Sequence, residues 1–474
     1  MRSAKAAAPN SILRNLPSVD ELLRSQSARE IIDAAGEQYL AALARKAIEI
    51  LRQEIGKDAA NDRSKESLLA DAEDRLKSLW QAEIKTEIKK VINATGVVIH
   101  TNLGRAPLSD NARRAIADEA SGYCTLEYNL ETGKRGKRGG RAERMLAELT
   151  GAESVLVVNN CAAAAFFVLT VFASGGEVVI SRGELVEIGG DFRVPDVLSQ
   201  SGAALREVGT TNRTKLADYE KAVGDHTRMI LRVHTSNYKI VGFTAMPTVA
   251  ELSALAKKHK ILLYEDIGSG ALFDLSEFGL ADEPVVSRSI EAGADVVSFS
   301  GDKLLGGPQS GIIVGRLDLI EKLRKHPLYR ALRVDKLGLA ALEATLQAYR
   351  RDSATSEIPV TRMLSMTESE IAERVVRFGK KLDEATGKNG NLQIEIVDGL
   401  SAVGGGAAPA TQLKTKLLAL SHRRMPAERL EHLLRSSDPP VIARIVDGRV
   451  MIDLRTVLED DEAEIAASIQ CLGK

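Results

Sequence analysis

ILLYEDIGSG at residues 261–270 and ADVVSFSGDKLLGGPQSG at residues 294–311 are the two stretches that indicate the fold most clearly. Each stretch contains a short apolar run, long enough for one strand, and ends in polar residues and glycines. Strands that are apolar on both faces are typical of a mostly parallel sheet covered by helices. The two stretches therefore predict consecutive buried strands of an α/β body, with polar side chains at the strand ends.

The same pattern extends on both sides of these stretches. Further short apolar runs alternate with helical segments: VLVVNN, EVVISR, ALREVG, RMILRVHT and GIIVG. We expect one large α/β domain over residues 86–350. After the Ile358-Pro359 step, helix and strand patterns and a hairpin around Asp447-Gly448 predict a smaller α+β domain over residues 351–474.

The beginning of the chain is helical in pattern. Apolar residues recur with a period near 3.6 from Ser18 to about Lys90, and Ser18 with Glu21 makes a candidate capping box. We therefore expect a helical domain over residues 1–85. No segment there has the continuous apolar core of a signal peptide.

Composition narrows the class of protein. The 474 residues include 44% hydrophobic residues and carry a formal net charge of -1, which gives no global preference for nucleic acid. Three widely separated cysteines, without histidines at ligand spacing, predict a reducing compartment and no structural metal. No apolar run is long enough to span a membrane, so we expect a cytoplasmic protein.

Asp266 ends the buried strand of the first stretch, and Lys303 lies just past the strand of the second. A lysine holds the aldehyde of pyridoxal 5'-phosphate (PLP) as a Schiff base, and a carboxylate keeps the pyridine nitrogen of this cofactor protonated. Taken singly, Asp266 could cap a turn and Lys303 could lie on the surface. Together, on consecutive buried strands, they favour PLP, and Ser300 is placed to donate a hydroxyl to its phosphate.

Two other strand ends carry candidate cofactor ligands. After VLVV, the residues Asn160, Cys161 and Ala162 begin a helix, whose free N–H groups and dipole favour a phosphate. The alternative is a helix start that only packs closely on the sheet. His234 and Ser236 follow the strand RMILRV, and we expect a hydrogen bond from this group to the phenolic oxygen of the cofactor, although His234 could equally be a core histidine.

Basic residues form three clusters. Arg105 lies in HTNLGRAPLS, the run KRGKRGGR occupies residues 134–141, and Arg330 and Arg333 lie in HPLYRALRVDK. Spaced i,i+3, Arg330 and Arg333 would present two guanidinium groups on one helix face, which suits a small tetrahedral oxyanion. The alternative is a solvated charged face. The glycine-interleaved run is typical of a loop that contacts phosphate, RNA or another subunit.

Six blocks together resemble bacterial selenocysteine synthase, the L-seryl-tRNA(Sec) selenium transferase family. They occur in the order of the family and cover most of the chain: INATGVVIHTNLGRAPLS, NLETGKRGKRGGRAE, SRGELVEIGGDFRVPD, EVGTTNRT, YEDIGSG and SFSGDKLLGGPQSGIIVGR. One departure is Cys161, where the family pattern has an asparagine. This departure affects the details of phosphate binding.

The resemblance implies a PLP-dependent transferase of fold type I, similar to aspartate aminotransferase, with an added N-terminal domain that contacts tRNA. It also implies a ring of subunits, typically a decamer of five dimers. The implied substrates are seryl-tRNA(Sec) and selenophosphate, and the product is selenocysteinyl-tRNA(Sec), formed through a PLP aldimine, β-elimination to an aminoacrylyl intermediate and addition of selenium.

The resemblance also implies roles for particular residues. Lys303 would remove the α-proton of the serine, and Asp302 would assist proton transfer to the leaving hydroxyl, unless it only stabilises the turn. Arg105, Arg330 and Arg333 would bind selenophosphate. Arg444 lies where related enzymes bind a free carboxylate, and its role here could be vestigial, structural or RNA-directed, since the serine is esterified to tRNA.

Two alternative functions share parts of this pattern. A PLP-dependent lyase for a small phosphorylated amino sugar acid resembles the same catalytic core but generally lacks the N-terminal extension. A non-catalytic tRNA-binding protein on the same fold would not need Lys303 and Asp266. Both features of the sequence therefore favour the transferase.

Overall fold

The computed structural model describes residues 12–57, 63–85, 87–188, 192–386, 391–405, 407–408 and 411–472. The chain divides into two compact units, Met1–Lys90 and Val91–Lys474. The segment for which we predicted no signal peptide lies partly outside the described residues, because residues 1–11 are not among them. Within the described residues, no helix combines the length and the apolar character that a membrane span requires.

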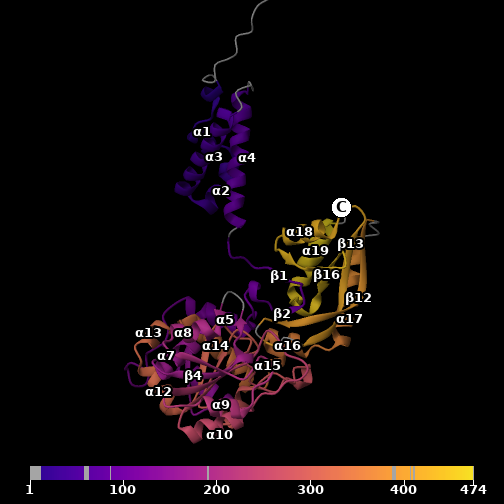
Figure 1. Cartoon of the computed structure of the whole chain (residues 1–474). Helices are drawn as coiled ribbons and strands as arrows, with labels where there is room; N and C mark the ends of the chain where they lie inside the picture. The colour runs from indigo at the N-terminus through magenta and orange to yellow at the C-terminus, as the bar shows by residue number, and fades with distance from the viewer. Residues whose placement is uncertain are drawn as a thin grey trace, which may run out of the picture. The chain divides into compact units, whose positions relative to one another are not determined.

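The first unit is a group of antiparallel and crossing helices (Figure 1). Its helices are α1 Val19–Leu23, α2 Gln26–Ala35, α3 Glu37–Lys57 and α4 Lys65–Lys85. The predicted capping box is confirmed, since the Glu21 N–H donates to Ser18 Oγ at 3.2 Å and the Ser18 N–H donates to Glu21 Oε2 at 2.9 Å. Leu22, Leu40 and Leu51 are fully buried, so apolar packing between the helices holds this unit together.

The second unit is built on a seven-stranded sheet with the order β3-β11-β10-β9-β8-β4-β7. Its strands are β3 Ser154–Val158, β4 Glu177–Ser181, β7 Ala204–Val208, β8 Thr227–Val233, β9 Leu262–Gly268, β10 Val296–Ser300 and β11 Gly311–Gly315. Neighbouring strands are parallel except β11, which is antiparallel to β10 and to β3. The expectation of a mostly parallel sheet is confirmed, and the two stretches that indicate the fold most clearly form adjacent strands.

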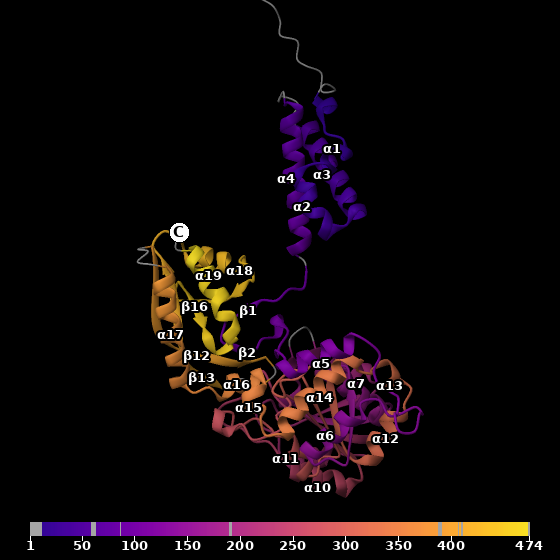
Figure 2. The ribbon, with the colours of Figure 1, turned by 180° about the vertical axis from the view of Figure 1, so that it is seen from behind.

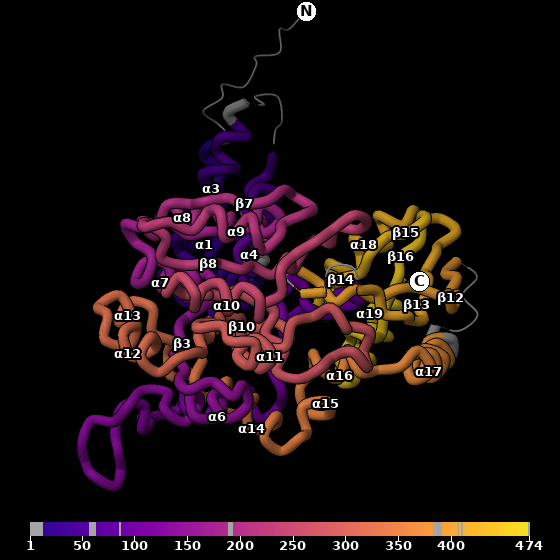
Figure 3. The backbone as a smooth tube through the Cα atoms, turned by 60° about the horizontal axis from the view of Figure 1, so that its bottom comes forward, coloured from indigo at the N-terminus to yellow at the C-terminus, as the bar shows by residue number. Residues whose placement is uncertain are grey.

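Helices pack on both faces of this sheet, as the apolar strands require. One apolar core includes residues of α6 Gly140–Thr150, α9 Leu216–Ala222, α10 Val249–His259, α11 Val286–Glu291 and α14 Lys336–Arg350. The other includes residues of α7 Cys161–Ala173, α8 Val194–Gln200, α12 Leu317–Lys325 and α13 Leu328–Ala331. Figure 3 shows α10 and α11 alongside β10. A short hairpin, β5 Glu187–Ile188 with β6 Phe192–Arg193, precedes α8.

The C-terminal part forms a second sheet with the order β15-β16-β13-β12-β2. Its strands are β2 Val97–Ile99, β12 Leu392–Gly404, β13 Gln412–His422, β15 Arg444–Val446 and β16 Arg449–Asp453. Helices α17 Glu368–Thr386, α18 Ala427–Arg435 and α19 Glu462–Leu472 accompany it (Figure 2). The predicted hairpin is confirmed by the antiparallel pairing of β15 with β16 around Asp447-Gly448.

An N-terminal segment completes this second sheet. Strand β2 pairs in parallel with β12, and β1 Ile92–Asn93 pairs in parallel with β14 Val441–Ile442. Strand β2 therefore joins the five-stranded sheet, and β1 forms a separate two-stranded sheet with β14, although we assigned both segments to the large domain 86–350. The domain boundaries at residues 85 and 350 stay predictions. The structure adds that β1 and β2 pair with strands of the C-terminal part.

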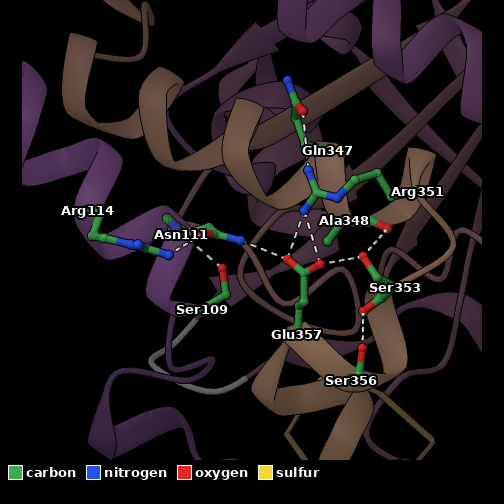
Figure 4. Close-up of polar contacts among 10 residues, drawn as sticks. Ser109, Asn111, Arg114, Gln347, Ala348, Arg351, Ser353, Ser356 and Glu357 are labelled. Carbon is green, nitrogen blue, oxygen red and sulfur yellow. Dashed lines mark hydrogen bonds and ion pairs between the residues drawn. The ribbon is translucent and has the colours of Figure 1, made fainter.

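A polar network fixes the chain where it leaves the large sheet (Figure 4). Glu357, in α15 Ala354–Glu357, accepts at Oε2 from Asn111 Nδ2 and from Arg351 Nη2, each at 2.8 Å, and at Oε1 from Ser353 Oγ at 2.5 Å. Asn111 belongs to α5 Asp110–Ala120, whereas Arg351 directly follows α14. The carboxylate thereby joins α5 to the turn before α16 Pro359–Ser365, which leads to the C-terminal sheet.

Candidate active site

Lys303 lies within the turn that follows β10, three residues after the end of the strand, and only 5% of its surface is exposed. Gly268, at the end of the adjacent strand β9, has a φ of +71°, and a Cβ built there would lie 3.7 Å from Lys303 Nζ. The positive φ favours glycine at this position, and the 3.7 Å distance places the amine of the lysine in van der Waals range of it. The predicted carboxylate, Asp266, also lies near the end of strand β9.

Asp266 is 9% exposed and is held by hydroxyl and thiol groups of its neighbours. Its Oδ1 accepts from Ser298 Oγ at 2.9 Å and from Cys161 Sγ at 3.5 Å. Ser298 Oγ also contacts the hydroxyl of Tyr264 at 2.7 Å. Burial raises the pKa of Asp266, and the bond from Ser298 and the charge of Lys303 oppose that rise.

The first turn of α7 lies beside this carboxylate. Asn160 caps the helix, because its Oδ1 accepts from the Ala163 N–H at 2.8 Å. Cys161 is in the first turn and contacts Asp266, whereas Ala162 is exposed at the helix start. Burial raises the pKa of the Cys161 thiol, and a hydrogen bond with Ser300 opposes that rise. The structure therefore brings predicted residues from three segments of the chain together at one edge of the sheet.

His234 and Ser236 follow β8, next to Asp266 in the sheet. The His234 N–H donates to the Asp266 carbonyl at 3.0 Å, and the Ser236 N–H donates to the His234 carbonyl at 2.9 Å. Burial lowers the pKa of His234, which favours the neutral imidazole. The His234 Nδ1 and Ser236 Oγ atoms are buried and have no hydrogen-bond partner among the described residues. Both are therefore available to a bound group.

Arg105 contacts the residue next to the lysine. Its Nη1 donates to Asp302 Oδ2 at 2.8 Å, and the aspartate side chain is 8% exposed. Arg105 follows Gly104 at the end of a short 3-10 helix and has a φ of +63°, an uncommon backbone conformation for a residue with a side chain. The sequence alone did not predict this pair, since 197 positions separate its members.

Arg330 and Arg333 do not share a helix face, so that prediction is wrong. Helix α13 ends at Ala331, and Arg333 follows it. Arg330 is exposed, whereas Arg333 lies over the ring of Tyr329 and pairs with Glu127, with 3.6 Å between Nη1 and Oε1. The carbonyl of Leu332 accepts from the Asn159 N–H at 2.9 Å, which places this segment beside the chain that enters α7.

Three features of the site escaped the sequence analysis. Ser298 and Tyr264 orient Asp266, and Glu283 approaches His234, with 3.8 Å between Oε1 and Nδ1. The signal for the first two was available, because a serine inside the run VVSFS and a tyrosine beside Asp266 are polar groups in buried strands. Arg444, whose role was left open, donates from Nη2 to the Leu400 carbonyl at 2.7 Å, which supports a structural role. Among the described residues, no three His, Cys, Asp or Glu side chains gather as a metal site.

Comparison with known proteins identifies relatives of the whole chain. The family described as SelA, L-seryl-tRNA selenium transferase, matches residues 91–458. The L-seryl-tRNA(Sec) selenium transferase of Geobacter metallireducens is 50% identical over 81% of this chain and 83% of its own. That of Geobacter sulfurreducens is 45% identical over 98% of this chain and 99% of its own.

A solved structure supports the fold. The structure of D-glucosaminate-6-phosphate ammonia-lyase superposes with a TM-score of 0.57 at 20% identity and covers 83% of this chain and 98% of that one. At this identity the likeness concerns the fold. Together with the sheet order and the helices on both faces, it confirms the predicted fold class.

Proposed function

The chain belongs to the L-seryl-tRNA selenium transferase family, and on that premise we propose that it converts L-seryl-tRNA(Sec) to L-selenocysteinyl-tRNA(Sec) with PLP and selenophosphate. The resemblance predicted from the sequence is confirmed by these relatives. The observation that carries the proposal is the buried pair Lys303 and Asp266 on adjacent strand ends, within a chain that matches its relatives over nearly its full length.

The residues of the site fit PLP. Lys303 would hold its aldehyde and Asp266 its pyridine nitrogen, while the free Nδ1 of His234 is suited to its phenolic oxygen. The first turn of α7, at Asn160, Cys161 and Ala162, offers backbone N–H groups to its phosphate. The hydroxyl of Ser300 is a candidate for the same phosphate, and Ser236, whose Oγ has no partner among the described residues, is with His234 a candidate for the phenolic oxygen.

Bound PLP supplies a ring that accepts the negative charge formed at the α-carbon of the serine. Asp266 supports this chemistry when it is ionised beside a protonated ring nitrogen. Its raised pKa applies to the protein without such a cation, and a positive charge at hydrogen-bond distance opposes the effect of burial. The bonds from Ser298 and Cys161 hold Oδ1 in place.

Lys303 would take the α-proton, and Asp302 would move a proton toward the departing hydroxyl. Arg105 orients Asp302 through its 2.8 Å bond. A guanidinium has five donors, so this bond is compatible with a second role for Arg105 in binding selenophosphate. Arg330 and Arg333 complete the proposed oxyanion site, for which the resemblance is the support.

The remaining parts of the proposal concern the assembly. The helical unit Met1–Lys90 would contact the tRNA, and the family resemblance supports a homodecamer made of five dimers. A cytoplasmic location stays a prediction. The rival reading as a lyase for a phosphorylated amino sugar acid is less well supported, because the relatives that match 98% of the chain include the helical unit.

The test is selenium transfer by the purified protein. Seryl-tRNA(Sec) and selenophosphate are incubated with the parent, with Lys303→Ala and with the control Lys322→Ala, which changes an exposed lysine of α12. Selenium on the aminoacyl-tRNA is measured, together with the absorbance of the lysine-bound cofactor. We expect transfer by the parent and the control, and a loss of at least about 1,000-fold in Lys303→Ala. A parent that binds PLP but transfers no selenium would favour the lyase.

A further inference from the structure

A cavity of about 630 Å³ lies beside the proposed PLP site, between the end of β8 and the segment 279–284. Its lining includes Arg232, His234, Glu265 and Glu283. The backbone of His234 also contacts Asp266. His234 therefore lies between the cavity and the site of Lys303. The volume lies within the range of pockets that bind small organic groups.

Two buried carboxylates of this cavity have acceptor atoms without partners. Glu265 is 4% exposed and Glu283 is 6% exposed. The Oε2 of Glu265 and the Oε1 of Glu283 have no hydrogen-bond donor among the described residues, since His234 Nδ1 at 3.8 Å is too distant. The other oxygen of Glu283 accepts from the Ala408 N–H at 2.9 Å, which holds the side chain in place. Buried acceptors of this kind indicate a ligand that carries hydrogen-bond donors.

The rest of the lining indicates what else the ligand carries. Leu280, Pro284 and Met246 contribute apolar surface. Lys239 lies at the exposed rim, where its Nζ pairs with Asp282 Oδ2 at 2.5 Å, and its side chain is 50% exposed. The cavity therefore combines deep acceptors, apolar walls and a cation at the rim. A nucleotide has the matching groups, namely hydroxyls and an exocyclic amine, an apolar base and a phosphate.

We propose that this cavity binds the 3'-terminal adenosine of the aminoacyl-tRNA, with Glu265 and Glu283 accepting from its free ribose hydroxyl and its amine. The inference rests on the proposed function. It explains how an ester-linked serine, which has no free carboxylate, is positioned: the cavity holds the nucleoside, and the seryl group extends past His234 toward Lys303. Lys239 would contact the phosphate of this nucleotide.

The test is equilibrium binding of adenosine 5'-monophosphate to the full-length, PLP-loaded protein, followed by calorimetry. Glu283→Gln keeps the size of the side chain but replaces an acceptor, and Glu277→Gln is the matched control at an exposed position two residues before this segment. We expect about tenfold weaker binding in Glu283→Gln and none of that loss in Glu277→Gln. The 2',3'-dideoxy nucleotide should bind the parent about fivefold more weakly than the ribonucleotide.

A second variant covers the case in which Glu283→Gln alters the fold. Lys239→Ala changes an exposed side chain and should weaken binding of the monophosphate by about threefold while leaving binding of adenosine unaffected. No saturable binding to the parent at millimolar nucleotide, or equal binding by parent, Glu283→Gln and Lys239→Ala, would overturn the inference. If selenium transfer succeeds while nucleotide binding fails, the cavity proposal alone is wrong. If binding behaves as expected and transfer fails, the proposed reaction is wrong and the cavity remains a nucleotide site.

Discussion

Glu184 has a fully buried carboxyl group that plays no part in the proposed mechanism. Its side chain has no exposed surface, and neither oxygen has a hydrogen-bond partner among the described residues. Burial raises its pKa to about 8, and the nearby charge of Arg232 opposes this. The group is therefore mostly neutral in the folded protein at neutral pH, which is how a single residue avoids the cost of an unpaired buried charge.

Glu184 predicts a pH dependence of stability. Its pKa is raised above the unfolded value, so between about pH 4.5 and about pH 8 the folded state retains a proton that the unfolded state has released. Stability from this group is full below that window and declines as pH rises through it. The free energy of unfolding of Glu184→Gln relative to the parent should therefore rise by about 2 kcal/mol between about pH 5.5 and about pH 7.5.

Urea unfolding of the parent and of Glu184→Gln at the two pH values measures this difference. Glu277→Gln serves as the exposed control and should follow the parent. If the two unfolding free energies change with pH in parallel, the Glu184 carboxyl does not titrate in this range, and its burial must be relieved by a contact that the structure does not show.

At the scale of elements, a buried arginine joins the strands of the C-terminal sheet to α16. Arg455 is 1% exposed, and its guanidinium donates to the carbonyls of Met363 at 2.8 Å, Met366 at 2.7 Å and Lys414 at 2.7 Å. Its Nε donates to Ser401 Oγ at 3.1 Å. Because the donors of one planar group satisfy acceptors from three segments, the arginine fixes how these elements pack.

Loss of these donors should destabilise the second unit. Arg455→Met keeps an apolar stem of similar length but leaves one buried and two half-buried carbonyls without the donors of the arginine, so we expect a loss of about 3–5 kcal/mol. Arg449→Met is the control on the preceding strand, where the ion pair with Glu395 involves a carboxylate that is 63% exposed, and it should cost about 1 kcal/mol or less. Denaturant unfolding followed by circular dichroism compares the two. Equal losses would show that the buried network adds no more than a surface pair.

The two units of the whole molecule have different proposed roles. The unit Val91–Lys474 contains every residue proposed for PLP and for the cavity, whereas the unit Met1–Lys90 is a helical group with an apolar core of its own. Each unit buries its own apolar side chains, so each meets the main requirement for independent folding.

Removal of the helical unit should separate cofactor binding from use of the tRNA. A chain that begins at Val91 is expected to keep the absorbance of lysine-bound PLP and to lose selenium transfer to seryl-tRNA(Sec) by about 100-fold or more, because the proposed tRNA contacts are absent. Absorbance and transfer are measured on the same preparation. Loss of the cofactor together with transfer would mean that the helical unit stabilises the catalytic unit, and unchanged transfer would contradict its proposed contact with tRNA.

Much of the architecture followed from the sequence because its signals are local. Apolar runs of strand length predicted the strands of the large sheet, Ser18 and Glu21 predicted a helix start, and the Asp447-Gly448 step predicted a hairpin. The chemistry of Lys303 and Asp266 could be predicted because each comes at the end of a buried run, and parallel strands end at one edge of a sheet.

The pairings between residues far apart in the sequence depend on tertiary packing, so the sequence did not predict them. Nothing near Arg105 indicates Asp302, and nothing in the periodicity around Arg333 indicates Glu127 rather than a shared face with Arg330. The same holds for β2, which joins a sheet whose other strands lie about 300 positions later, and for Glu283 beside His234. Short-range patterns in the sequence were enough to predict which elements form and which residue types reach the sheet edge, because both depend on neighbouring residues. The partners of polar side chains were decided by how the elements pack, because a charged residue can pair with any opposite charge that the fold brings within reach.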